Sequence, residues 1–252
     1  MKLSILFPEK NQGEKMIRHI FDEVVPYFDQ QGIEYEVVIC PNGCSKEEMA
    51  LLSNASFPSQ VRVLENATPG KGNGVRQGIL AAKGEYVLFM DADLSTGLDV
   101  YEKEVAPRMG KDDAIIASRD VKGSVYGLKQ PFMRRATHFG SRMIIAMMFH
   151  LKIKDTQCGY KAFKTSVARF IAEKQIVDGF AFDVEYLYFL RRNGFSIAEV
   201  PCVWTDDPDS TIRKSMKVYK DFYKDLRRIK KNKKNYLLTS EERALAKGEE
   251  AC

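Results

Sequence analysis

Residues 86–95 read YVLFMDADLS, an apolar run that ends in two aspartates, Asp91 and Asp93. Five consecutive apolar residues bounded by turn residues are typical of a fully buried strand. We therefore expect both carboxylates to emerge together from the carboxyl end of that strand. An Asp-X-Asp turn can also serve only to cap a following helix, but its position after a buried strand favours a functional role.

Outside this segment, strand and helix patterns alternate through the first half of the chain. The patterns predict strands at residues 2–7, 35–40, 61–65, 86–90 and 114–118, and helices at 14–28 and 74–82. Such alternation is typical of a parallel sheet built from βαβ units. The prediction is an α/β fold, doubly wound around a mixed, mostly parallel sheet with helices on both faces.

Polar loops follow several of the predicted strands, with PNG at 41–43 and the aspartate pair at 91–93. Ligands of open α/β sheets bind at the carboxyl ends of the strands. Carboxylate oxygens suit hard ions such as Mg²⁺ and Mn²⁺, and such an ion offsets the charge that develops on a diphosphate leaving group. Asp91 and Asp93 are therefore predicted to bind Mg²⁺ or Mn²⁺.

A glycine-rich segment, PGKGNGVRQG at 69–78, precedes a predicted helix and contains two cations, Lys71 and Arg76. Backbone N–H groups at a helix start and the positive end of the helix dipole favour an anion such as a diphosphate. The glycine spacing matches neither the Walker loop nor the dinucleotide-binding motif. A flexible turn explains the segment equally well by itself, and the aspartate pair that follows favours the phosphate interpretation.

The composition is that of a globular protein, with 252 residues, 44% of them hydrophobic, 29% charged, and a net charge of +5. The longest apolar run, at 143–149, is far below the ~20 residues that a membrane-spanning helix needs. Five cysteines without a CxxC pair indicate neither a disulfide framework nor a zinc site. No nucleic-acid-binding signature is present. These features predict a cytoplasmic protein without a nucleic-acid partner.

Positive charge is concentrated near the C-terminal end, in a predicted basic amphipathic helix at 215–231. Its apolar stripe and its cations lie on different faces. The apolar stripe consists of Tyr219, Phe222, Leu226 and Ile229. The cations are Lys217, Lys220, Lys224 and Arg228. One interpretation is peripheral contact with the cytoplasmic face of a membrane. The other is an ordinary helix that packs its apolar stripe on the domain. Beyond it, residues 232–252 are predicted to form a flexible polar tail.

Four segments occur in order along the chain: FPEKNQGE at 7–14, PNG at 41–43, GKGNGVRQG at 70–78 and FMDADLS at 89–95. Together they resemble the family 2 inverting glycosyltransferases, which have the GT-A fold. Two later segments, DTQCGYKAF at 155–163 and FAFDVEYLYFLRRNGFSIAEVPCVW at 180–204, resemble in particular the dolichyl-phosphate β-glucosyltransferases and related polyprenyl-phosphate glycosyltransferases. The resemblance covers about residues 2–230.

The resemblance implies metal-dependent transfer of a hexose from a nucleotide sugar to a polyprenyl or dolichyl phosphate. UDP-glucose is the favoured donor and GDP-mannose the second. The implied donor-binding residues are Pro8, Glu9, Asn42, Lys71, Arg76, Asp91 and Asp93. Relatives usually have two acidic residues where this chain has Pro41-Asn42, so a carboxylate that recognises the base is lost.

On the acceptor side, Arg and Lys are the side chains that bind phosphate. The candidates for the lipid phosphate are Arg119, Arg134, Arg135 and Lys161, and the resemblance adds Asp183 as the residue that faces the acceptor. We therefore assign catalytic roles to Asp183, Arg119 and Lys161. For Asp183, a helix N-cap is nearly as good an explanation.

Two alternatives remain at this point. The same fold serves transfer to a sugar or protein hydroxyl, against which the basic helix argues. The chain could also be a catalytically silent nucleotide-sugar-binding protein, against which the intact aspartate pair argues.

For domain organisation, we predict one GT-A domain at 1–231, with a nucleotide-sugar-binding half (1–119), an acceptor-side region (120–212) and the basic helix (213–231). The tail follows at 232–252. The sequence leaves open whether the chain forms a homodimer.

Overall fold

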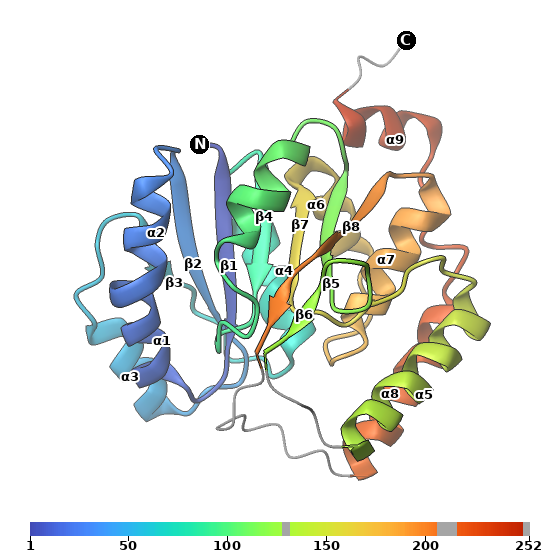
Figure 1. Ribbon diagram of the computed structural model, residues 1–252, viewed down its shortest axis with the longest axis horizontal. Coiled ribbons are helices and arrows are strands. Elements are labelled where there is room, and N and C mark those ends of the chain that lie inside the picture. Colours follow the sequence, from blue (N-terminus) through green and yellow to red (C-terminus); the bar gives the residue numbers. More distant parts are fainter. Residues whose placement is uncertain (128–131, 206–215, 249–252) are drawn as a thin grey trace.

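The computed structural model describes residues 1–127, 132–205 and 216–248, with the backbone alone for 132–137 and 216. At its centre is a seven-stranded sheet in the order β3-β2-β1-β4-β7-β5-β8 (Figure 1). Its strands are β1 (Leu3–Glu9), β2 (Tyr35–Pro41), β3 (Val61–Val63), β4 (Tyr86–Met90), β5 (Ala114–Ser118), β7 (Tyr160–Lys164) and β8 (Ile197–Pro201).

The sheet is mixed and mostly parallel. Pairs β1–β2, β1–β4, β2–β3 and β5–β8 are parallel, whereas β7 runs antiparallel to both of its neighbours, β4 and β5. The central strands are buried along their whole length, as expected for strands covered on both faces. A small second sheet pairs β6 (Val125–Tyr126) with β9 (Val203–Trp204).

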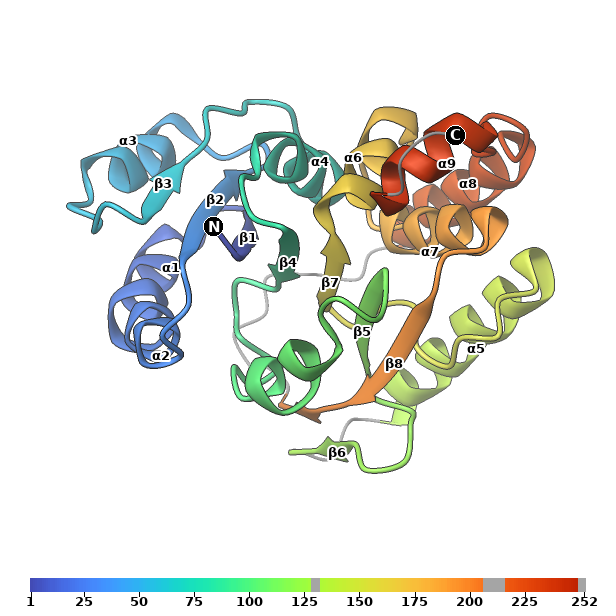
Figure 2. The same ribbon diagram turned by 90° about the horizontal axis from the view of Figure 1, so that it is seen from above.

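Helices cover both faces of the main sheet (Figure 2). One apolar core lies between the sheet and α4, α6 and α7, and the other lies against α1, α2 and the turns after Val100. The helix bounds are α1 (Gly13–His19), η1 (Ile20–Val24), α2 (Val25–Gln30), α3 (Lys46–Asn54), α4 (Lys71–Ala81), η2 (Tyr101–Val105), η3 (Ala106–Arg108), α5 (Phe132–Phe149), α6 (Thr165–Lys174), α7 (Phe182–Asn193), α8 (Met216–Lys231) and α9 (Ser240–Lys247).

The glycine-rich segment differs from its prediction, because the helix expected at 74–82 already begins at Lys71. Its glycines are therefore in the first turns of α4, where they permit close packing. A Cβ on Gly72 would lie 2.7 Å from the Cβ of Phe182, and one on Gly74 would lie 3.0 Å from the carbonyl oxygen of Cys40. Gly70, just before the helix, has a φ of +125°, a conformation that favours glycine.

The prediction of a flexible tail is wrong for residues 232–248. Tyr236 and Leu238 are buried, and Thr239 and Glu242 form a capping box at the start of α9. The end of α9 packs on α6, where the Ser166 hydroxyl donates to the carbonyl oxygen of Ala246 at 2.6 Å. Residues 249–252 are outside the described part of the chain.

The basic helix is present as α8, and residues 213–215 of its predicted range are outside the described residues. Two members of its apolar stripe, Leu226 and Ile229, are buried in the main core, so this stripe packs on the domain. None of the described helices combines the length and apolarity needed to cross a bilayer. The cysteines at 40, 44, 158 and 202 are free thiols.

Candidate active site

The candidate site lies where β2, β1 and β4 end side by side, at the lower edge of the sheet in Figure 1. The loop after β2 carries Asn42, and the loop after β4 carries Asp91 and Asp93. The sheet order brings these loops together because all three strands run in the same direction. The loops with Asn42, Asp91 and Asp93 therefore lie at the same edge of the sheet.

Lys71 and Asp91 form the first charged pair of the site. The Lys71 ammonium, at the start of α4, lies 2.5 Å from Asp91 Oδ1. Burial lowers the pKa of Lys71, but Asp91, Asp183 and Asp93 outweigh it and raise the pKa overall. Lys71 therefore stays charged, and its contact with an anionic ligand remains a prediction.

The Asp93 side chain stabilises the turn in which it lies. One of its oxygens, Oδ1, accepts from the Ser95 amide at 3.0 Å and from the Ser95 hydroxyl at 2.6 Å. A ring nitrogen of His19, Nδ1, also contacts the Ala92 carbonyl oxygen at 3.0 Å, so this nitrogen carries the proton of the bond. No local pattern indicated this contact, because His19 on α1 and Ala92 are 73 residues apart and meet only in the folded protein.

Lys161 and Asp183 form the second pair, and both side chains are buried. Lys161, on β7 opposite Phe89, lies 2.6 Å from Asp183 Oδ1 and also donates to the Cys158 carbonyl oxygen. Burial raises the pKa of Asp183, while Lys161 and Lys71 act in the opposite direction. The N-cap of α7 is Ala181, without a side-chain cap, so the helix-cap explanation of Asp183 is wrong.

The donor atoms at Asp91 and Asp93 fit a hard divalent cation. Both residues are partly exposed, and carboxylate oxygens are the ligands that Mg²⁺ and Mn²⁺ prefer. Asp91, Asp93 and Asp183 stand against Lys71 and Lys161, which leaves one net negative charge. A bound cation would therefore meet a favourable local potential.

Pro8, Glu9 and Asn42 are buried where β1 and β2 end. Glu9 accepts from the Gln12 amide at 2.5 Å and from the Cys44 thiol at 2.9 Å, and burial raises the pKa of Glu9. The Asn42 amide donates to the Glu9 carbonyl oxygen at 2.7 Å. These bonds tie two site loops together, and contact of these residues with a nucleotide remains a prediction.

Arg76 lies further along α4, and its buried Nε has no hydrogen-bond partner among the described residues. A buried donor without a partner costs free energy, and contact of Arg76 with the donor substrate remains a prediction.

Arg119 makes a bidentate ion pair with Asp155. Its Nε lies 2.6 Å from Oδ2 and its Nη2 lies 2.9 Å from Oδ1, and the guanidinium lies 5.4 Å from the ring centroid of Trp204. This pair holds the pKa of Asp155 well below its usual range, against the effect of burial. A phosphate at Arg119 would therefore share the guanidinium with Asp155. Arg134 and Arg135 lie on α5, and their side chains are outside the described part.

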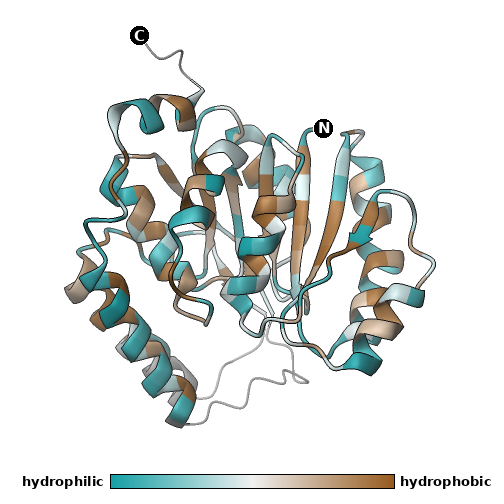
Figure 3. Ribbon diagram, turned by 180° about the vertical axis from the view of Figure 1, so that it is seen from behind, coloured by the Kyte–Doolittle hydropathy of each residue, from teal (hydrophilic) through white to brown (hydrophobic). Residues whose placement is uncertain are grey.

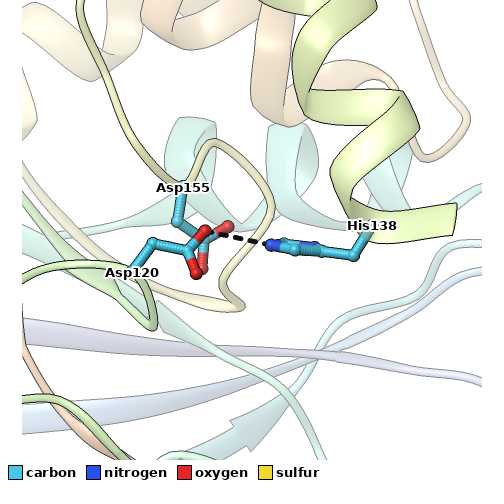
Figure 4. A group of neighbouring side chains, drawn as sticks. All are labelled: Asp120, His138 and Asp155. Atoms are coloured by element: carbon cyan, nitrogen blue, oxygen red, sulfur yellow. Dashed lines mark hydrogen bonds and ion pairs between the residues drawn. The ribbon is translucent and has the colours of Figure 1, made fainter. Parts of the chain in front are cut away.

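Asp120, His138 and Asp155 form a further cluster that no sequence pattern indicated, and their potential ligand atoms all lie within 4.8 Å of one another (Figure 4). His138 Nε2 and Arg142 Nη1 lie 3.1 and 3.2 Å from Asp120 Oδ2. The two carboxylates are thus already balanced by two guanidiniums, those of Arg119 and Arg142. Asp155 is buried and paired with Arg119, whereas Asp91 and Asp93 are both partly exposed, so the aspartate pair after β4 is the more accessible to a cation. No short spacing in the sequence could have revealed residues so far apart.

The chain matches the profile of the family described as glycosyl transferase family 2 over residues 4–172. It is 30% identical over 221 residues to the dolichyl-phosphate β-glucosyltransferase of Drosophila melanogaster, covering 82% of this chain and 68% of that protein. A dolichyl-phosphate β-glucosyltransferase of Trichomonas vaginalis is 29% identical over 223 residues, covering 83% of this chain and 66% of that protein. The chain thus spans about two thirds of the length of these relatives.

Two solved structures have a similar fold. Glucosyl-3-phosphoglycerate synthase from Mycobacterium tuberculosis, in complex with uridine diphosphate, superposes with a TM-score of 0.66 at 14% identity, covering 91% of this chain and 80% of that one. Staphylococcus aureus TarS, residues 1–349 in complex with UDP-GlcNAc, gives a TM-score of 0.58 at 17% identity, covering 91% of this chain and 65% of that one. At these identities the likeness is one of fold.

Proposed function

The chain belongs to glycosyl transferase family 2 and has the predicted GT-A fold, and we propose that it is an inverting hexosyltransferase. The hexose would pass from a nucleotide sugar to dolichyl or polyprenyl phosphate. Glucose from UDP-glucose is the favoured donor. The observation that carries the proposal is that two Lys–Asp pairs, Lys71–Asp91 and Lys161–Asp183, lie close enough for Lys71 to act on the Asp183 carboxylate. The names of the curated relatives support the lipid acceptor.

In this proposal the diphosphate of the donor lies at the start of α4. Its negative charge would interact with Lys71 and with the positive end of the helix, and Arg76 is a further cation on the same helix. Asp91 and Asp93 are the residues that would hold Mg²⁺ or Mn²⁺, which when bound neutralises charge on the leaving diphosphate. Pro8, Glu9 and Asn42 are the proposed supports of the nucleoside.

The acceptor oxygen attacks the anomeric carbon from the face opposite the diphosphate. A C–O bond to the acceptor forms while the C–O bond to the diphosphate breaks, and the electron pair leaves with the nucleoside diphosphate. A phosphate acceptor is already anionic and needs little base assistance. Asp183, oriented by Lys161, would place the acceptor, and it would take the proton if the acceptor were a hydroxyl. Arg119, Arg134, Arg135 and Lys161 are the proposed contacts of the lipid phosphate.

A peripheral contact with a membrane surface is part of the proposal. Because the apolar stripe of α8 packs inward, the apolar contribution must come from α5, where Phe139, Met143 and Met147 are 60%, 46% and 61% exposed at a spacing of four residues. Helix α5 contacts α8, on which Lys217, Lys220 and Lys224 are exposed, and polar and apolar residues alternate along the surface helices in Figure 3. Apolar side chains beside a row of cations are typical of helices that lie on anionic lipid.

The deciding experiment measures products. The purified chain is incubated with UDP-glucose or GDP-mannose, with Mn²⁺ or with a chelator, and with a short polyprenyl phosphate or a matched polyprenol. We expect glucosyl phospholipid and released UDP only with the phosphate acceptor and the metal. Transfer to hydroxyl acceptors alone would favour the hydroxyl-transferring enzyme. Donor binding with neither transfer nor hydrolysis would favour the silent binding protein.

A further inference from the structure

Glu185 is a buried carboxylate that the proposed reaction does not use. It lies on α7, two residues after Asp183, and its side chain is inaccessible to solvent. Oε1 accepts from the Ile176 amide at 2.8 Å and from the Tyr236 hydroxyl at 2.6 Å. Oε2 accepts from the Val177 amide at 3.0 Å. Removing a carboxylate from water is costly, and here two hydrogen bonds from backbone amides and one from a phenol offset that cost.

Glu185 binds the segment 176–179, which packs against the glycine-rich start of α4. We call this segment the wall. The Asn73 amide donates to the Asp178 carbonyl oxygen at 3.2 Å. A Cβ on Gly72 would lie 2.8 Å from the Val177 carbonyl oxygen and 3.0 Å from that of Gly179. The wall and the helix start are therefore in direct backbone contact.

Gln175 adds a second tie between the same two segments. Its Nε2 donates to the Gly72 carbonyl oxygen at 3.0 Å and to that of Val177 at 2.6 Å, and its Oε1 accepts from the Tyr186 hydroxyl at 2.6 Å. Behind the wall, Arg228 on α8 donates to the Ile176 carbonyl oxygen at 2.9 Å. The wall is thus fixed from both sides.

Lys71 connects this arrangement to the reaction. It is the first residue of α4, and its ammonium reaches Asp91. A displacement of the wall would shift the helix start and move the ammonium away from Asp91. We propose that Glu185, together with Tyr236, is a positioning residue that fixes the start of α4 for the diphosphate of the donor. The inference rests on the proposed function for the identity of the ligand, whereas the mechanical part rests on the contacts alone.

Four variants test the proposal. Glu185→Gln places an amide N–H₂ group against backbone N–H donors and so loses at least one hydrogen bond, and Tyr236→Phe removes the phenol. The matched control Glu36→Gln alters another buried carboxylate near the start of β2, which binds Ser4 at 2.6 Å, the Lys83 amide at 2.7 Å and Arg62 at 2.9 Å. The second control, Tyr35→Phe, removes a hydrogen bond of 2.6 Å to Asp29.

Two measurements are compared across the variants. The affinity for UDP with Mn²⁺ is measured by calorimetry, and amide hydrogen exchange is followed at residues 71–76. We expect Glu185→Gln to weaken UDP binding about tenfold and Tyr236→Phe about threefold, as the loss of one buried hydrogen bond predicts, with faster exchange at 71–76 in both. The controls should leave both quantities within about twofold of wild type while their melting temperatures fall by similar amounts.

Loss of melting temperature in Glu185→Gln with unchanged UDP affinity and unchanged exchange would make Glu185 a purely structural residue and overturn the proposal. If Glu185→Gln does not fold, the UDP affinity and the amide exchange of Tyr236→Phe test the proposal in the same way. If wild type itself binds no UDP, the proposed function fails, and the exchange data still decide whether Glu185 fixes the start of α4.

Discussion

The carboxylate of Asp91 lies against the Cα of Gly159, so closely that a Cβ at position 159 would overlap it. The Asp91 amide also donates to the Gly159 carbonyl oxygen at 2.9 Å. The contact follows from the antiparallel pairing of β4 with β7, which places Met90 opposite Tyr160. Gly159 therefore determines where the first aspartate of the site can stand.

Gly159→Ala should displace the Asp91 carboxylate and weaken Mn²⁺-dependent UDP binding by more than about tenfold, because the added methyl occupies the position of the carboxylate. Calorimetry measures the affinity, and circular dichroism checks the fold. Gly140→Ala is the matched control, since a Cβ there meets nothing within 4 Å. Equal UDP affinity in the two variants would contradict the positional role of Gly159.

Asp91→Asn and Asp93→Asn should each abolish the dependence of UDP binding and turnover on Mn²⁺ while leaving the fold intact. The asparagine at 93 keeps an oxygen that can accept from Ser95, so the turn survives and only the charge is lost. Titration of the metal against enzyme activity measures the effect. Asp99→Asn, at an exposed carboxylate paired with Lys103, serves as the control. Undiminished metal-dependent transfer by either site variant would refute the assignment of that aspartate.

Lys161→Met and Asp183→Asn should each lower the free energy of unfolding by about 3–5 kcal/mol, because each leaves a buried group without its partner. The double variant should be less destabilised than the sum of the two single variants. Urea denaturation of the four proteins measures this coupling. All three variants should lose transfer activity, since Asp183 is the proposed acceptor residue. Strictly additive losses of stability would show that the pair does not act as a unit.

Burial raises the pKa of Glu185 from 4.5 to about 7, although Tyr236, the Ile176 and Val177 amides and Arg228 lower it. Between these values the folded protein binds more protons than the unfolded chain, so the contribution of Glu185 to stability is fully present below pH ~4.5 and is lost as the pH rises through ~7. The loss is about 3 kcal/mol.

Urea denaturation of wild type and Glu185→Gln at several pH values measures this contribution. The stability of wild type relative to the variant should decrease from pH 5 to pH 8, because only wild type carries the titrating carboxyl. Parallel stability curves for the two proteins would contradict the raised pKa.

Changing Lys217, Lys220 and Lys224 together to Glu should abolish binding to anionic liposomes. Each cation within a Debye length of the membrane surface contributes about 1 kcal/mol to the binding free energy. Co-sedimentation at low ionic strength measures it, and added salt should weaken wild-type binding. The control changes Lys46, Lys103 and Lys111 to Glu, which gives the same net charge on exposed residues elsewhere. Equal sedimentation of the two triple variants would remove the membrane role of α8.

Local patterns were sufficient for much of the architecture. The strands at 86–90 and 114–118 have the predicted bounds, since a short apolar run between turn residues leaves few alternatives to a buried strand. The loops after parallel strands could likewise be placed at one edge of the sheet from chain direction alone. The start of α4 could not be predicted in this way, because glycine disfavours a helix locally. Only the packing of residues 176–179 against this helix start makes glycine the residue that fits at position 72.

The family, the sheet with its polar edge and the amphipathic character of α8 all follow from local sequence patterns. Which side chains meet depends on how the chain folds. The insertion of β7 between β4 and β5 brings Lys161 to Asp183 and Gly159 to Asp91, and the return of the chain after α8 brings Tyr236 to Glu185. The physical reason is that periodicity and turn chemistry act over a few residues, whereas ion pairs and buried hydrogen bonds depend on strand order and on which face is covered.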